Sequence, residues 1–251
     1  MFKKIFLLVV ACSILLFASE KPYTGVKYTG VLAKPSTYKY REITTNSYTA
    51  PKFDIKQKSA MLNEYILKAK DDESLKESIL EKFYGKKIDK NFDLNAYLEY
   101  ISFADKEDMI VRQVFFVNTI KLAEKRGADV NKVDKNGNTP LINAVLIKDY
   151  PSFYIKALST TKADASIENK DGETAIIILT KKYLTFKYYN DDTIETPLRA
   201  FNFESSDPKH KDKNGKSAFD YYMEALKSGQ KFPYGDYSLV PLSEMLSANK
   251  K

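Results

Sequence analysis

Cysteine, histidine and tryptophan are almost missing from this chain of 251 residues, which has one Cys, one His and no Trp. The single Cys12 excludes an intramolecular disulfide, so the stability of the fold must come from packing. A catalytic triad or a zinc site would draw on histidine or cysteine. The only histidine, His210, lies in the run Lys209-His210-Lys211. We therefore expect a solvated turn histidine there and not a general base.

Other marks of catalysis are also lacking. No Gly-rich loop of the P-loop or dinucleotide-binding type occurs in the sequence. A carboxylate hydrolase acting on cell-wall sugars stays open as a class, because any two acids can meet in a fold, but no motif supports it. We expect no catalytic residue, no metal ion and no cofactor.

Only one long apolar run occurs, from Ile5 to Ala18, and it follows Lys3 and Lys4. A membrane-spanning helix needs about 20 apolar residues, whereas a charged start, a shorter apolar run and small residues are typical of a signal peptide. We expect a bacterial signal peptide over residues 1–18, cleaved near Ala18, and a periplasmic or secreted mature chain. Val9-Val10-Ala11-Cys12 loosely resembles a lipoprotein lipobox, so a lipidated or retained N-terminus, and hence a membrane anchor, is the alternative.

Blocks of one charge are absent as well. The 40 Lys and Arg residues exceed the 33 Asp and Glu residues by 7, and the two signs alternate along the chain. A nucleic-acid interface would need a basic patch and a recognition motif. We therefore expect no nucleic-acid partner.

Residues 19–58 contain few aliphatic side chains and are interrupted by Pro22, Pro35 and Pro51. Such a segment has little to bury, so we expect extended or disordered chain, with a tyrosine-rich binding arm as the alternative. From Ser59 onward apolar residues recur at spacings of three and four, for example at Leu75, Ile79, Leu80 and Phe83, which is typical of helices.

Residues 59–126 therefore form a helical N-terminal region in our prediction. Met61, Leu62, Tyr65, Ile66 and Leu67 are expected on one apolar face. Further helices are expected at about Phe92–Ala104 and Lys106–Lys125.

The second half of the chain repeats itself. Its three related segments are Asp134-Lys135-Asn136-Gly137-Asn138-Thr139-Pro140-Leu141, Asn169-Lys170-Asp171-Gly172-Glu173-Thr174-Ala175-Ile176 and Asp212-Lys213-Asn214-Gly215-Lys216-Ser217-Ala218-Phe219. A second landmark, the aspartate at 129, 164 and 207, precedes each segment. Both landmarks move by 35 residues between the first two copies (172 − 137 and 164 − 129) and by 43 between the last two (215 − 172 and 207 − 164).

These segments resemble the ankyrin repeat family, whose unit of about 33 residues begins its first helix with Thr-Pro-Leu after a glycine turn. The resemblance covers about Gly127 to Leu226 and is divergent, because only the first copy keeps the proline and none keeps the usual histidine. It implies an all-α, ankyrin-like helical repeat solenoid with short β-turn fingers over residues 127–231. The helical region 59–126 would then be a cap or degenerate repeats, and residues 232–251 a C-terminal capping segment with a helix at about Tyr237–Asn249.

The residue types agree with such turns. Gly137, Gly172 and Gly215 suit a position of positive φ. The hydroxyl residue two positions later in each copy, Thr139, Thr174 or Ser217, is expected to cap the next helix. The side chains of Leu141, Ile176 and Phe219 are expected to begin its buried face.

The family resemblance implies recognition of another protein through the turn tips and the inner helices. The tip positions, expected to be exposed, are Lys135, Asn136, Asn138, Lys170, Asp171, Glu173, Lys213, Asn214 and Lys216. Lysine recurs at one position in all three copies, which is either a basic edge for a partner or a set of solvated turn residues.

The second copy carries an insertion, Lys182–Thr196, which is rich in aromatic residues. Its rings at Tyr183, Phe186, Tyr188 and Tyr189 form either a binding loop or part of the core. We therefore expect an exported ankyrin-like protein-binding scaffold without catalysis. The alternative is an envelope-associated structural protein anchored through its N-terminus.

Overall fold

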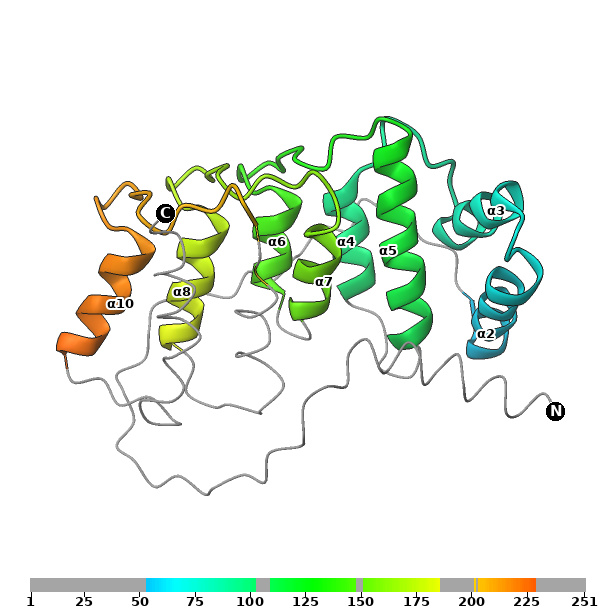
Figure 1. Ribbon diagram of the computed structural model, residues 1–251, viewed down its shortest axis with the longest axis horizontal. Helices are drawn as coiled ribbons and strands as arrows, with labels where there is room; N and C mark the ends of the chain where they lie inside the picture. The colour runs from blue at the N-terminus through cyan, green and yellow to red at the C-terminus, as the bar shows by residue number, and fades with distance from the viewer. Residues whose placement is uncertain (1–52, 103–108, 148–150, 186–200, 202, 229–251) are drawn as a thin grey trace, which may run out of the picture.

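The structure, a computed structural model, describes the chain except for residues 1–52, 103–108, 148–150, 186–200, 202 and 229–251 (Figure 1). The expected signal peptide, Cys12 and nearly all of the segment 19–58 lie outside the described residues. So do most of the aromatic insertion and the C-terminal segment 232–251.

The described part of the chain is helical and contains no strand, which confirms the all-α class. The predicted helices at about 92–104 and 106–125 correspond to α4 and α5. In chain order the elements are α2 (Ile55–Asn63), the π-helical turn η1 (Glu64–Lys68), α3 (Glu73–Tyr84), α4 (Leu94–Ser102), α5 (Met109–Lys125), α6 (Pro140–Leu146), α7 (Pro151–Leu158), α8 (Ala175–Thr185) and α10 (Ala218–Lys227).

Four helices, α4, α6, α8 and α10, stand in a row in which each packs against the next (Figure 1). A second layer consists of α5 and α7, which pack against each other and against α4 and α6 respectively. At the N-terminal end α2 and α3 pack on α5. The loops that lead into α6, α8 and α10 lie side by side along one edge of the row (Figure 1). This edge carries the three repeated segments.

The first described helix begins earlier than the sequence led us to expect. We predicted extended chain up to residue 58, but α2 starts at Ile55 because Asp54 and Gln57 form a capping box. The Asp54 carboxylate accepts from the Gln57 N–H at 2.8 Å, and the Gln57 side chain accepts from the Asp54 N–H at 2.9 Å. Leu67, expected on the apolar face, is 57% exposed. It lies in η1, where the wider π-helical turn changes the register of the face.

Aromatic rings fill the core where α3, α4 and α5 meet. The ring centres of Phe83 and Phe115 are 4.5 Å apart, and those of Tyr97 and Phe116 are 5.7 Å apart. All four side chains are buried. At the edge of this core Arg126 donates to Glu81 and, at 2.7 Å, to Glu77 of α3. These contacts hold the end of α5 against α3 within the region 59–126.

The predicted helix caps are confirmed at two of the three repeated positions. The hydroxyl of Thr139 accepts from the N–H of Ile142 at 3.2 Å, and Pro140 occupies the first turn of α6. Ser217 caps α10 through a capping box with Asp220. The prediction is wrong for Thr174, whose buried hydroxyl oxygen makes no hydrogen bond.

The first apolar residue of the helix after each turn was predicted to be buried, and this prediction is also confirmed in only two of the three copies. Leu141 and Ile176 are each 1% exposed, as predicted, because each helix lies between two neighbours of the row. Phe219 contradicts the prediction, since it is 41% exposed. Its helix, α10, is the last described helix of the row, and among the described helices it packs mainly against α8. No helix within the described residues is long and apolar enough to cross a membrane.

Candidate functional site

The three repeated segments form turns with the same backbone hydrogen bonds. We call residues 134–138 the first turn, 169–173 the second turn and 212–216 the third turn. In each turn the glycine N–H donates to the carbonyl of the first residue, at 2.9, 3.0 and 2.9 Å. The N–H of the first residue donates to the carbonyl of the last, at 2.9, 3.0 and 3.0 Å. The predicted repeat is therefore also a repeat in hydrogen bonding.

A side-chain oxygen closes each turn a second time. Asp134, Asn169 and Asp212 open the three turns, and the Oδ1 atom of each accepts from two backbone N–H groups further along its own turn. The distances lie between 2.7 and 3.1 Å. An aspartate or asparagine at this position therefore fixes the shape of the tip.

The turn glycines adopt the positive φ that the sequence predicted, at +78°, +72° and +73°. Two of them also lie against the following turn. A Cβ atom on Gly137 would come within 3.1 Å of the backbone nitrogen of Lys170, and one on Gly172 within 3.0 Å of that of Lys213. Gly215, in the last turn, has no neighbour within 4 Å. Neighbouring turns are thus in close contact along the edge.

The recurring lysines connect these turns. Lys135, Lys170 and Lys213 are all exposed. The ammonium of Lys170 donates to the carbonyl of Lys135 at 2.7 Å, and the ammonium of Lys213 donates to the carbonyl of Lys170. Each of the two later lysines therefore bonds to the backbone of the preceding turn, and its positive charge stays at the solvent-exposed edge.

The other predicted tip residues differ in burial. Asp171 and Asn214 are exposed, and Asn136 and Lys216 are half-buried. Asn138 and Glu173 were expected to be exposed, but they are buried. Each is the last residue of its turn, and its side chain bends back toward the next helix. Asn138 Nδ2 donates to Asn143 at 3.1 Å, whereas Glu173 accepts from Lys181.

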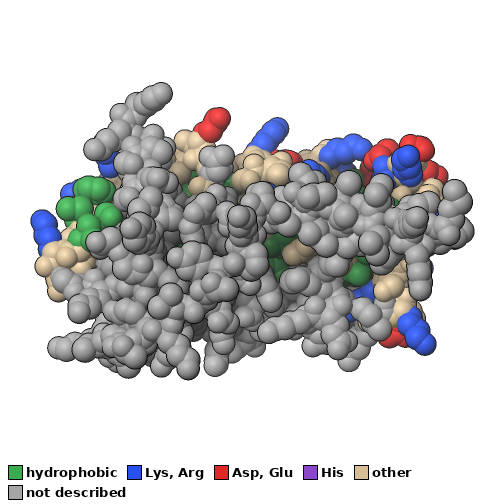
Figure 2. Space-filling model, turned by 60° about the horizontal axis from the view of Figure 1, so that its bottom comes forward, with side chains coloured by type: hydrophobic (Ala, Val, Ile, Leu, Met, Phe, Trp, Pro, Cys, Tyr) green, Lys and Arg blue, Asp and Glu red, His purple; other side chains and the backbone are tan. Residues whose placement is uncertain are grey.

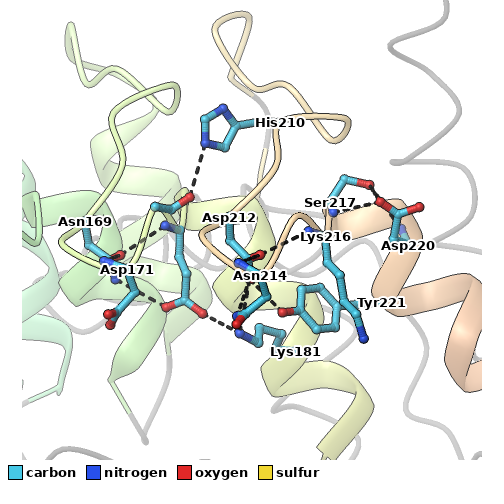
Figure 3. Close-up of polar contacts among 12 residues, drawn as sticks. Asn169, Asp171, Lys181, His210, Asp212, Asn214, Lys216, Ser217, Asp220 and Tyr221 are labelled. Carbon is cyan, nitrogen blue, oxygen red and sulfur yellow. Dashed lines mark hydrogen bonds and ion pairs between the residues drawn. The ribbon is translucent and has the colours of Figure 1, made fainter.

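A polar cluster between α8 and α10 joins the second turn to the third (Figure 3). Lys181 of α8 forms an ion pair with Glu173, and its Nζ lies 3.8 Å from Asp212 Oδ2. The hydroxyl of Tyr221 donates to the same oxygen of Asp212 at 2.6 Å. The Lys181 ammonium also lies 4.6 Å from the centre of the Tyr221 ring.

These contacts fix the ionisation of the cluster. Burial opposes the charge on Asp212, but hydrogen bonds from Tyr221 and from backbone N–H groups outweigh it, so the pKa of this carboxyl is lowered. Burial likewise opposes the charge on Lys181, but the bond to Glu173 holds its pKa above the ordinary value. The pKa of Tyr221 is raised by burial and by its bond to Asp212. Asp212 and Lys181 are therefore charged at neutral pH and Tyr221 is not.

We predicted a solvated turn histidine at His210. The structure corrects this prediction, because the ring has hydrogen-bond partners within the protein. Its Nε2 lies 3.0 Å from a carboxylate oxygen of Glu168 and 3.2 Å from the carbonyl oxygen of Gly172. Both partners are acceptors, so this nitrogen carries a hydrogen. The histidine therefore joins the third repeat to the second, which accounts for its partial burial.

Sequence reasoning missed a buried lysine behind the turns. Lys182 is 4% exposed, and its ammonium donates to the carbonyls of Val145 and Ile147 at 2.7 Å each. It thereby satisfies carbonyl groups at the end of α6, which have no partner within that helix. Because Lys182 stands beside a second lysine, Lys181, the sequence carries no signal of its burial, and only packing reveals its role.

Of the four rings of the aromatic insertion, only that of Tyr183 belongs to a residue of a described helix, α8, and this side chain is not described. Phe186, Tyr188 and Tyr189 lie outside the described residues. The choice between a binding loop and part of the core thus stays as the sequence left it. Among the residues that the structure describes, no group of three His, Cys, Asp or Glu side chains could hold a metal ion.

Comparison of the chain with protein-family models and with curated proteins finds no match.

Proposed function

We propose that the chain is a divergent ankyrin-like repeat protein that binds another protein through its three turn tips and performs no catalysis. The observation that carries the proposal is the threefold recurrence of one turn. Each copy has the same backbone bonds, the same closing side-chain oxygen and a glycine of positive φ. A solenoid of such repeats presents a row of rigid tips, and rigid tips lose little conformational entropy on binding.

The side chains at the edge support a binding role for the tips. Lys135, Lys170, Asp171, Lys213 and Asn214 are exposed on turns whose backbones are already ordered. Lys170 and Lys213 also donate to the preceding turn, but their ammonium groups stay at the solvent-exposed edge. Asp212, the first residue of the third turn, instead pairs with Lys181 of α8 and accepts from Tyr221. The exposed charges of the tips are therefore within reach of a partner, whereas the charges of Asp212 and Lys181 hold the turns together.

Export through the N-terminal residues 1–18 is part of the same proposal. It rests on the apolar run and its flanking charges. Mass spectrometry of the mature N-terminus tests it. A chain that begins at Ser19 or Glu20 is the expected result, whereas a lipidated Cys12 would support the anchored alternative.

The binding proposal is tested by crosslinking the mature protein in envelope extract. Charge reversal at the tips, Lys135→Glu with Lys170→Glu and Lys213→Glu, should abolish the crosslinked species. Replacement of the same lysines by Gln keeps a hydrogen-bond donor for the neighbouring carbonyl, so it separates loss of charge from loss of the turn contact. Lys56→Glu and Lys82→Glu, exposed on α2 and α3, are the matched controls. Equal capture by the tip and control variants would reject the tips as the binding surface.

A further inference from the structure

The outer face of α10 carries an exposed apolar stripe. Phe219 is 41% exposed and Leu226 is 38% exposed, and the half-buried Met223 lies between them in sequence. Spacings of four and three place these residues on one side of the helix. Figure 2 shows hydrophobic side chains at the surface at the end of the molecule formed by α10.

This stripe is additional to the face that holds α10 in the row. Ala218, Tyr222 and Ala225 are the buried residues of α10, and α10 packs against α8. Two of the four large hydrophobic residues that are exposed in the described part of the chain belong to this one helix. Contiguous exposed apolar surface of this kind marks a contact with another segment or chain.

We propose that residues 241–249 of the same chain cover this stripe as a short helix antiparallel to α10. The segment contains Leu242, Met245 and Leu246 within nine residues. Pro241 suits the first turn of a helix, where a missing N–H is not needed, and disfavours helix for the residue before it. The helix would therefore begin at residue 241 and not at Tyr237, where the sequence pattern alone placed it.

The two apolar patterns match in reverse order. Met223 and Phe219 are four residues apart, as are Leu242 and Leu246. An antiparallel arrangement pairs Met223 with Leu242 and Phe219 with Leu246. A nine-residue helix is about 14 Å long, close to the roughly 15 Å of the ten-residue α10.

The chain between the two helices permits this return. Residues 229–240 include Gly229, Pro233 and Gly235, which favour turns. Twelve residues can span roughly 40 Å, more than the length of α10 that has to be retraced. Attachment in the same chain also gives the segment a high effective concentration at the stripe, which a second copy of the protein lacks.

Cysteine crosslinking in the full chain tests this arrangement on a Cys12→Ser background. Phe219→Cys with Leu246→Cys should form an intramolecular disulfide under mild oxidation. Phe219→Cys with Ala248→Cys, on the opposite side of the proposed helix, is the matched control. We expect the first pair to react at least about tenfold faster, because a disulfide needs Cα atoms within roughly 7 Å.

A second measurement does not depend on cysteine. Leu242→Lys should speed hydrogen exchange of the α10 amides, whereas Ala248→Lys, an apolar-to-Lys change on the opposite side, should leave it unchanged. Disulfides only between chains would show that a second copy occupies the stripe and would overturn the proposal. Equal reaction of the two cysteine pairs, or equal exchange in the two lysine variants, would also overturn it.

Discussion

At the scale of single residues, the turns depend on side chains that the sequence pattern assigned to the surface. Asn138 and Glu173 occupy positions that vary between the copies, and variation is usual for exposed residues. Their burial follows from the helix that each turn precedes, because its first turns offer partners such as Asn143 and Lys181. A single sequence contains no signal for these pairings, which join residues five and eight positions apart across a change of structure.

The turn glycines allow a prediction about close packing. Gly172→Ala should lower the free energy of unfolding by about 1–3 kcal/mol, because positive φ and a contact of the new Cβ with the Lys213 backbone both disfavour a side chain. Gly215→Ala, at nearly the same φ but without a neighbour, should cost only about 1 kcal/mol. Urea unfolding measures both. Equal losses would show that the two turns are not in contact.

Gly137→Val, at the turn glycine of the first copy, should also lower the free energy of unfolding by about 1–3 kcal/mol. An unchanged unfolding curve would show that this glycine does not need its positive φ.

Asp212 supplies a pH-dependent prediction. Its lowered pKa means that the native state favours the ionised carboxylate, so this stabilisation exists above the ordinary pKa of 3.8 and is lost as the pH falls below it. Tyr221→Phe removes the hydroxyl that donates to this carboxylate. The variant should lose about 1.5–3 kcal/mol of stability at pH 7, the usual range for a hydrogen bond to a charged group.

Below the native pKa of Asp212 the carboxyl is protonated with or without the tyrosine hydroxyl. The stability difference between wild type and Tyr221→Phe should therefore shrink when urea unfolding is repeated at successively lower pH below 3.8, the ordinary pKa of this carboxyl. A difference that stays constant with pH would show that the hydroxyl acts through packing and not through the ionised carboxylate.

At the scale of helices, the sequence predicted much of what the structure shows. Spacings of three and four residues located α3, α4 and α5, and the Thr-Pro pair located the start of α6. The early start of α2 depends on Asp54 and Gln57, a capping box without the expected Ser or Thr. The exposure of Phe219 depends on its position at the end of the row. Periodicity identifies an apolar face but does not say whether a neighbour covers it.

The unequal caps lead to a prediction at this scale. Thr139→Val should lower the free energy of unfolding by about 1 kcal/mol, because it removes the hydroxyl that accepts from the N–H of Ile142. Thr174→Val should be neutral or stabilising, since its buried hydroxyl oxygen has no partner and a methyl group of similar shape replaces it. Thermal unfolding of both variants provides the comparison. A loss at Thr174 as large as that at Thr139 would show that Thr174 also caps its helix.

At the scale of the whole molecule, packing in the row takes place between neighbours. Apart from the turns, α10 meets α8, α8 meets α6, and α6 meets α4, while the aromatic core around Phe115 lies at the far end. The sequence held no information on the links between copies, such as His210 with Glu168, because each joins residues some 40 positions apart.

Packing between neighbours predicts that damage stays local. Tyr222 of α10 is buried. Its replacement by alanine should lower the free energy of unfolding by roughly 3–5 kcal/mol, because the packing of the ring is lost. In a stack whose units contact only their neighbours, that loss opens the nearest units first. Hydrogen exchange of the Tyr222→Ala variant should therefore accelerate in α10 and α8 and stay unchanged in α4 and α5. Phe115→Ala should give the reverse pattern, since Phe115 packs against Phe83 and Tyr65 at the N-terminal end. Equal acceleration in all helices of either variant would show that the described part of the chain opens as one unit, and that the threefold repeat of the turns does not extend to its energetics.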